Sequence, residues 1–175
     1  VFTPPAINNT PTKSGNLLGW WTFDNDSGTT VADSSGNGYD GVASSANIYK
    51  TDVPFGTGKS IDLNGNQYVT VSDGGNQLTF NGGNAFSIST WVKEWPDGGW
   101  EPYISKKGEG QGWQLRRRGG DQDRICFTTR GVGNDDWYFQ KNINDNQWHH
   151  LVGTFGSGVR RGYVDGVMYG EETRF

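Results

Sequence analysis

Asn-Gly and Asp-Gly pairs break this chain at short intervals, and long helices do not fit between them. Glycine, with 28 of the 175 residues, supplies the positive φ angles that tight hairpin turns need. The pairs that separate strand-like segments are Asn37-Gly38, Asn64-Gly65, Asp73-Gly74, Asn81-Gly82, Asp97-Gly98 and Asp165-Gly166. Aromatic residues make up 14% of the chain, whereas the helix-favouring Ala, Leu, Glu and Lys are sparse. This balance predicts an all-β chain.

The segments between the turns are rich in β-branched and aromatic residues. The candidate strands are Leu17–Phe23, Lys59–Leu63, Gln67–Ser72, Phe86–Lys93, Pro102–Lys106, Gly112–Arg117, Arg124–Arg130, Asp136–Lys141, Trp148–Phe155 and Arg160–Val164. Strands spaced by about ten residues are typical of an antiparallel β-sandwich or jelly roll. We therefore predict an all-β fold built as an antiparallel β-sandwich.

One domain is expected to account for most of the chain. A length of 175 residues is enough to bury a core without disulfide bonds, and the single cysteine, Cys126, is expected to be a buried thiol in a strand. Residues Val1–Asn16 contain three prolines and no apolar period, so we interpret them as a Pro/Thr-rich linker. Residues 17–175 then form the domain.

Charge and hydropathy argue against two classes of partner. The net charge of −4 and a pI near 5.1 give no general attraction to nucleic acid. No apolar run approaches the length of a membrane-spanning helix. We therefore expect no nucleic-acid partner and no membrane insertion.

Alternation within the strands assigns their two faces. In Phe86–Lys93, the side chains of Phe86, Ile88 and Val92 share one side, and Trp91 and Lys93 lie on the other. The following strands place Leu115, Ile125 and Phe127 on an apolar face. Arginines occupy the opposite face of these strands: Arg116, Arg118, Arg124 and Arg130. The pattern thus predicts one apolar sheet face and one that is rich in arginine.

Six motifs carry a family resemblance through their order along the chain. They are Leu18–Asp24, Asp33–Gly38, Ser60–Leu63, Phe86–Lys93, Gln147–His150 and Tyr163–Gly166. In this order they resemble the concanavalin A-like, laminin-G-like jelly-roll domains of bacterial secreted and surface proteins. The resemblance covers residues 17–170 and implies a secreted or cell-surface location. Such domains continue through further strands, so we expect that this one lacks its last strands or is completed by a strand from a partner.

An acidic loop suggests a structural calcium site. Asp33, Ser35 and Asn37 occupy alternate positions before Gly38, as in the first half of a calcium-binding loop. The twelfth position is Ser44 and no helices flank the loop, so an EF-hand is excluded. In the resembled family, calcium commonly joins early aspartates to an Asp near the C-terminus. The predicted ligands are Asp24, Asp33, Asn37 and Asp40, with Asp26 as a further carboxylate. The alternative is that Asp33, Asn37 and Asp40 are turn residues that bond their own backbone.

A ligand site is predicted where arginines and aromatic residues come together. Guanidinium groups suit carboxylates or sulfates, and aromatic rings stack on sugars. The predicted contacts are Arg116, Arg118, Arg124, Arg130, Trp95, Trp100, Trp137 and Tyr138, and they favour a glycan, including an acidic polysaccharide. Two alternatives remain open: the arginines pair with nearby acids, and the tryptophan loop folds back on the sheet. The acids in question are Glu101, Glu109, Asp121, Asp123, Asp135 and Asp136.

Catalytic patterns are weak in this chain. No alternating Glu-x-Asp-x-Glu strand, as in related jelly-roll glycanases, occurs, and His149 and His150 lie in an ordinary strand pattern. We therefore expect a non-catalytic carbohydrate-binding or adhesion module of a secreted or surface multidomain protein, with a glycan or a surface protein as partner. One alternative is an assembly module of a surface fibre or adhesin that self-associates. Another is a divergent polysaccharide hydrolase or lyase that uses His150 or Glu101.

Overall fold

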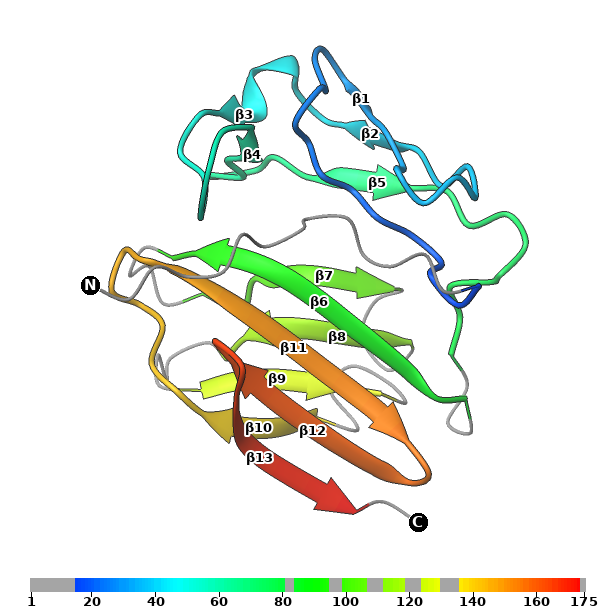
Figure 1. Cartoon of the computed structure of the whole chain (residues 1–175), viewed down its shortest axis with the longest axis vertical. Coiled ribbons are helices and arrows are strands. Elements are labelled where there is room, and N and C mark those ends of the chain that lie inside the picture. The colour runs from blue at the N-terminus through cyan, green and yellow to red at the C-terminus, as the bar shows by residue number, and fades with distance from the viewer. Residues whose placement is uncertain are drawn as a thin grey trace. The chain divides into compact units, whose positions relative to one another are not determined.

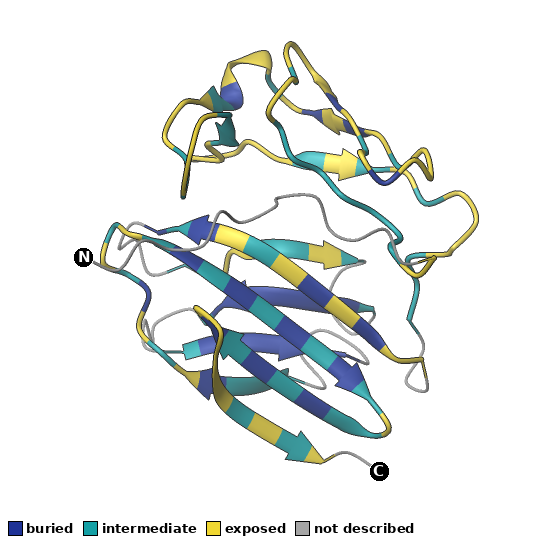
Figure 2. Cartoon of the chain, viewed as in Figure 1, coloured by how far each residue is buried: buried dark blue, intermediate teal, exposed yellow. Residues whose placement is uncertain are grey.

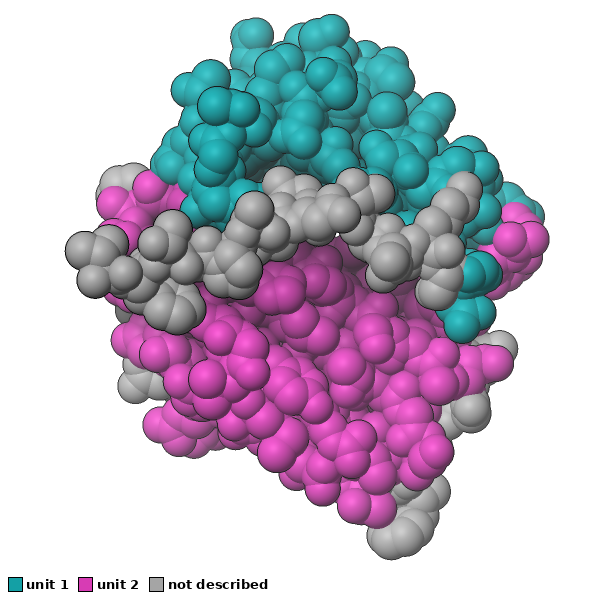
Figure 3. Space-filling model, in the orientation of Figure 1, with its two compact units in different colours: residues 1–74 teal, residues 75–175 magenta. Residues whose placement is uncertain are grey.

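The protein forms two compact units, residues Val1–Gly74 and Gly75–Phe175, which Figure 3 distinguishes by colour. A computed structural model describes residues 15–80, 84–94, 99–106, 112–118, 124–129 and 136–173. Most of the predicted linker, residues 1–14, therefore lies outside the described residues. No helix in the described ranges is long and apolar enough to cross a membrane.

The first unit contains two small antiparallel sheets. Strands β1 (Thr30–Val31), β2 (Gly41–Ala43) and β5 (Val69–Val71) pair in the order β1-β2-β5. Strand β3 (Tyr49–Lys50) pairs with β4 (Ser60–Ile61), after a single turn of 3-10 helix, η1 (Ala46–Ile48). Val31, Ala43 and Ile48 form its small core, against which Trp21 and Phe23 pack.

The second unit is a sandwich of two four-stranded antiparallel sheets (Figure 1). One sheet has the order β13-β12-β11-β6, with β6 (Phe86–Lys93), β11 (Trp148–Gly156), β12 (Val159–Val164) and β13 (Val167–Thr173). The other has the order β10-β9-β8-β7, with β7 (Pro102–Lys106), β8 (Trp113–Arg117), β9 (Arg124–Thr128) and β10 (Asp136–Gln140). Apolar side chains from both sheets form one core. The predicted fold class, an antiparallel β-sandwich, is confirmed.

Alternating side chains explain why these strands bury one face. Along β6, Phe86, Ile88 and Val92 are buried, and Trp91 on the other side is 38% exposed, as predicted. The residues of β11 alternate in the same way between buried and half-buried, which Figure 2 shows as alternating colours. Glycines let aromatic rings of the opposite sheet approach closely: a Cβ atom at Gly162 would lie 2.4 Å from the ring of Phe139.

Two-residue turns connect the last three strands. Asp165 and Gly166, with φ angles of 50° and 80°, join β12 to β13, which confirms the predicted Asp-Gly turn. Ser157 and Gly158 have φ angles of 51° and 73° and make the same kind of turn between β11 and β12. The sequence pattern did not predict β13, because Val167–Thr173 combines exposed apolar residues with two adjacent glutamates. Pairing with β12 decides its structure.

The prediction of a strand at Leu17–Phe23 is wrong. The segment runs as irregular chain and makes its contacts through turn residues instead of a strand ladder. The backbone N–H of Trp20 donates to the side chain of Asp33, and the carbonyl of Trp20 accepts from Ser34 N–H. Phe23 has a φ angle of 64°, which a regular strand does not allow.

Candidate functional site

The predicted arginine face is the outer face of the sheet formed by β7 to β10. Arg116 of β8 pairs with Cys126 of β9, and Cys126 pairs with Tyr138 of β10, so the three side chains form one row. Their neighbours Leu115, Phe127 and Phe139 lie in the core on the other face. The row itself is closed to solvent at its centre, because Arg116 is 5% exposed and Cys126 is fully buried.

Asp136 is the polar centre of this face. One of its carboxylate oxygens, Oδ2, accepts from Arg116 Nη2 at 2.5 Å and from the Tyr138 hydroxyl at 3.0 Å. The other, Oδ1, accepts from Thr128 Oγ1 at 2.8 Å. Burial alone lowers the pKa of Arg116, but its contacts with Cys126 and Asp136 outweigh this and raise the pKa above its usual value. For Arg116, the alternative of pairing with a nearby acid is therefore observed.

Aromatic rings flank two of the arginines. The guanidinium carbon of Arg116 lies 4.6 Å from the centre of a Trp100 ring, and that of Arg118 lies 4.9 Å from the ring centre of Tyr138. Trp100 is 49% exposed, whereas Arg118 and Tyr138 are half-buried. Burial, followed by the hydrogen bond to Asp136, raises the pKa of Tyr138 to about 12. We call Trp100, Arg116, Arg118 and Tyr138 the arginine–aromatic cluster.

Of the four remaining predicted contacts, the structure describes Trp137 and Arg124. Trp137 faces the core, where it packs with Phe139 at a ring distance of 5.5 Å and lies under Arg160. Arg124 is half-buried, and its carbonyl accepts from Arg118 N–H at the start of β9. Trp95 and Arg130 lie outside the described residues. Trp137 and Tyr138 are consecutive residues of β10, so their side chains lie on opposite faces of the sheet.

The acidic loop is built around the carboxylate of Asp33. Its Oδ1 accepts from the N–H groups of Trp20 and Ser35, both at 2.9 Å. Its Oδ2 accepts from the Ser35 hydroxyl at 2.7 Å and from Tyr39 N–H at 3.0 Å. Partial burial alone raises the pKa of Asp33, but these hydrogen bonds outweigh it and hold the pKa below its usual value. The carboxylate is therefore saturated by donors from its own loop and from the segment that contains Trp20.

The other predicted calcium ligands also bond the polypeptide. Asn37 donates through Nδ2 to the carbonyls of Leu17 and Leu18, and Asp40 accepts from Asp33 N–H at 2.8 Å. Asp24 accepts from Lys59 N–H at 3.2 Å. The ranges that the structure describes contain no group of three or more acidic, His or Cys side chains placed to hold a metal ion. Each of these predicted ligands is bonded to the polypeptide, and the calcium site stays a prediction.

A second polar group includes Glu101, which was considered for catalysis. The Tyr103 hydroxyl donates to Glu94, which is only 8% exposed, and burial, followed by this acid, raises the pKa of Tyr103 strongly. Arg117 donates to the carbonyl of Gly99 and lies 3.5 Å from Glu101. With a raised pKa, Tyr103 keeps its proton near neutral pH, so in this group it acts as a hydrogen-bond donor and not as a base.

The two histidines have different surroundings. His149 is buried between Asp145 and Asp165. His150 stacks on Trp91, with ring centres 5.0 Å apart, and its Nε2 lies 2.7 Å from the Ser89 hydroxyl. The sequence pattern placed both histidines in a strand, but it did not reveal the aspartates, which come from segments before and after β11.

The arrangement defines a class of protein: a two-sheet β-sandwich with a polar, aromatic-rich outer face. A family model described as the concanavalin A-like lectin/glucanases superfamily, of the laminin G type, matches residues 63–175. The chain belongs to this family.

Comparison with solved structures gave a further likeness. A crystal structure of residues 221–444 of an S-layer domain-containing protein from Clostridium thermocellum ATCC 27405 has a TM-score of 0.51 with this chain. The two share 24% identity over 89% of this chain and 72% of the other, which shows a common fold. Comparison with curated proteins gave no match.

Proposed function

We propose that this chain is a non-catalytic carbohydrate-binding module of a secreted or surface multidomain protein. The observation that carries the proposal is the arginine–aromatic cluster, which combines a half-exposed indole with two guanidinium groups on one sheet face. An indole stacks on the apolar side of a sugar ring, and a guanidinium binds a carboxylate or sulfate through paired hydrogen bonds. An acidic glycan combines both features.

The members of the cluster have different roles in this proposal. Trp100 is the stacking surface, because about half of its area is exposed. Arg116 is buried and bound to Asp136, so it holds Trp100 in place from below. Arg118 is half-buried and lies against Tyr138, which makes it the cation that meets an anionic group of the glycan. Ordering these side chains in advance reduces the entropic cost of binding.

The surface location rests on analogy. The family includes lectins and glucanases, and the similar crystal structure belongs to an S-layer domain-containing protein. Modules of this kind, placed on a bacterial surface, meet polysaccharides or neighbouring surface proteins. We place the chain in that setting and assign it a glycan partner, with a surface protein as the second candidate.

A glycan array with acidic and neutral members tests the proposal. The full chain is expected to bind acidic glycans, and Trp100→Ala and Arg118→Gln are each expected to weaken binding by about tenfold. Trp91→Ala is the matched control, because Trp91 is a comparably exposed tryptophan on the other sheet of the sandwich. The absence of binding by the unmodified chain, or equal losses in all three variants, would overturn the assignment.

The same protein sample distinguishes glycan binding from the two alternative functions, polysaccharide cleavage and self-assembly. Incubation with polysaccharides is expected to leave them uncleaved. Cleavage that disappears in Glu101→Gln or His150→Ala would identify an enzyme instead. Concentration-dependent self-association without glycan binding would identify an assembly module.

A further inference from the structure

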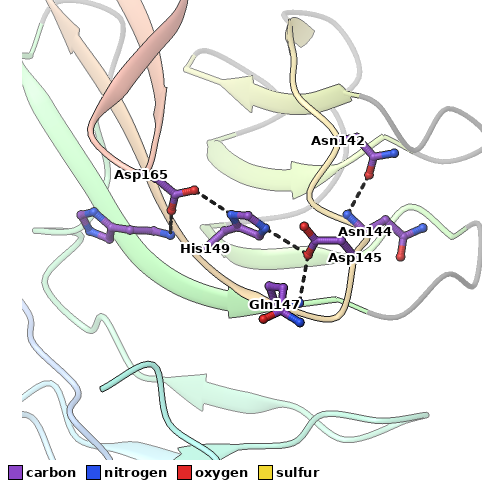
Figure 4. A network of polar contacts seen from close by, with 7 residues as sticks. Asn142, Asn144, Asp145, Gln147, His149 and Asp165 are labelled. Atoms are coloured by element: carbon purple, nitrogen blue, oxygen red, sulfur yellow. Dashed lines mark hydrogen bonds and ion pairs between the residues drawn. The ribbon is translucent and has the colours of Figure 1, made fainter. Parts of the chain in front are cut away.

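His149 lies between two carboxylates that come from distant segments (Figure 4). Its Nδ1 is 2.7 Å from Asp165 Oδ2, in the turn between β12 and β13, and its Nε2 is 3.1 Å from Asp145 Oδ1, in the segment before β11. The residue is only 9% exposed. On β6 it pairs with Val92, so that strand presents an apolar side chain at this position.

The protonation state of the ring follows from the chemistry of these contacts. A carboxylate oxygen only accepts hydrogen bonds, and a neutral imidazole carries a single N–H. Both contacts of His149 are therefore hydrogen bonds only when the ring is an imidazolium with two N–H groups. In the neutral ring, one nitrogen lone pair would face a carboxylate oxygen.

Backbone hydrogen bonds hold both carboxylates where they are. Asp145 Oδ1 also accepts from Gln147 N–H at 2.9 Å, and the same segment is ordered by Asn144 N–H donating to Asn142 Oδ1 at 2.8 Å. Asp165 Oδ1 accepts from His150 N–H at 2.9 Å, and Asp165 N–H donates to the His150 carbonyl at 2.9 Å. Neither carboxylate can turn away from the ring without losing a backbone bond.

We propose that Asp145, His149 and Asp165 form a proton-operated clasp, in which a protonated His149 ties residues 142–147 to the β12–β13 hairpin and a neutral His149 releases Asp145. Asp145 is the partner that is released because its contact is longer and its side chain is more exposed, at 53% against 46% for Asp165. Asp165 stays attached through its two backbone bonds to β11. The clasp thus opens at the segment before β11 and leaves the hairpin turn in place.

The pH range of the clasp follows from the groups that face it. Burial alone lowers the pKa of His149, but Asp165 and Asp145 outweigh it and raise the pKa above the usual 6.5. The clasp is therefore complete below about pH 6.5 and opens as pH rises through the higher folded-state pKa. Despite partial burial, the hydrogen bond from Gln147 N–H, followed by the contacts with His149, lowers the pKa of Asp145 below 3.8. Also despite partial burial, the pKa of Asp165 is lowered by His149, followed by His150 N–H and Lys141. The clasp is lost again only as pH falls below about 4.

His150 provides an internal reference for this behaviour. Burial lowers its pKa below 6.5, and the charge of Asp165 opposes the shift without reversing it. The chain has only two histidines, and they are adjacent, so their titrations are directly comparable. The net charge of the protein would move the pKa values of two adjacent histidines in the same direction, so it cannot explain opposite pKa shifts at His149 and His150.

Nuclear magnetic resonance titration of the unmodified full chain between pH 5 and 9 tests the proposal. We expect the ring C–H signals of His149 to titrate above pH 6.5 and those of His150 below it. The amide signal of Gln147, which bonds Asp145, should shift with the midpoint of His149. A His149 midpoint at or below 6.5, or a Gln147 amide that does not follow it, would overturn the proposal.

A variant isolates the role of Asp145. Asp145→Asn keeps the shape of the side chain and removes its charge, so the His149 midpoint is expected to fall by about one pH unit while that of His150 stays unchanged. Asp62→Asn is the matched control, because Asp62 is an exposed aspartate in the other unit, 3.7 Å from Lys50. An unchanged His149 midpoint in Asp145→Asn would show that Asp145 is not part of the clasp.

Discussion

Arg160 and Glu172 form an ion pair inside the sandwich, with Arg160 Nη2 2.5 Å from Glu172 Oε2 and the arginine side chain only 1% exposed. The two residues face each other across β12 and β13, and Arg160 also donates to the carbonyl of Phe127 in the opposite sheet. Next to them, Arg161 and Glu171 make a similar pair, at 2.6 Å, on the outer face. Strand β13 is thus attached by charge pairs on both of its faces.

The inner pair is expected to matter more than the outer one. Glu172→Gln removes the charge of the carboxylate that pairs with the buried guanidinium and should lower the free energy of unfolding by about 2 kcal/mol, less than for a fully buried pair because Glu172 is 35% exposed. Glu171→Gln removes the partner of a well-exposed arginine and should cost less than about 1 kcal/mol. Urea unfolding of both variants measures the difference. Equal losses of unfolding free energy in Glu172→Gln and Glu171→Gln would show that burial of Arg160 does not strengthen its ion pair.

Gly162 is expected to tolerate no side chain. Because a Cβ atom there would lie 2.4 Å from the ring of Phe139, Gly162→Ala should force the two sheets apart locally and cost about 2 kcal/mol or more. At Gly156 the nearest atom to an added methyl group would be the Cβ of Ala85, at 3.4 Å, so Gly156→Ala should cost less than about 1 kcal/mol. Thermal unfolding of the two alanine variants checks the contrast, and a stable Gly162→Ala protein would contradict this packing.

Calcium is expected to have no effect on the stability of the Asp33 loop. Asp33 already accepts hydrogen bonds from Trp20, Ser35 and Tyr39, so Asp33→Ala should cost about 2 kcal/mol or more whether or not calcium is present. The melting temperature in excess calcium and in chelator provides the measurement. A stabilisation of about 3 kcal/mol at a hundredfold excess over the dissociation constant would instead support the calcium site predicted from the sequence.

The thiol of Cys126 should be inert in the folded protein. It is fully buried next to Thr128, and burial raises its pKa, so little reactive thiolate is present near neutral pH. A thiol reagent should label it slowly in buffer and rapidly in denaturant. Fast labelling under native conditions would show that β9 opens readily.

Stability should depend on pH through His149 above about pH 7. In this range His150 is mostly neutral in both folded and unfolded chains, because its pKa is about 6.5 when unfolded and lower when folded. His149 has a raised pKa, so its contribution is present below pH 6.5 and declines as pH rises through the folded-state value. The melting temperature of the unmodified chain should therefore fall across this range, and that of Asp145→Asn should fall less. A flat profile for the unmodified chain would contradict this expectation.

Local patterns were sufficient for much of the sandwich. The alternation in Phe86–Lys93 identified both β6 and its buried face, and the pair Asp165-Gly166 identified a hairpin turn, because period-two burial and positive φ angles depend on a few neighbouring residues. The same patterns failed at Leu17–Phe23, where aromatic residues suggested a strand. Contacts of Trp20 with Asp33 and Ser34 decided that segment.

The candidate sites depended on contacts that no short pattern contains. Alternation placed Arg116 and Arg118 on one face, but only the register of β8, β9 and β10 brought Asp136 to Arg116. The adjacent histidines were visible in the sequence, yet the aspartates that favour protonation of one of them come from a preceding loop and a following turn. Secondary structure reflects neighbours along the chain, whereas charge pairing and pKa values reflect neighbours in space, and the folded sandwich alone decides those.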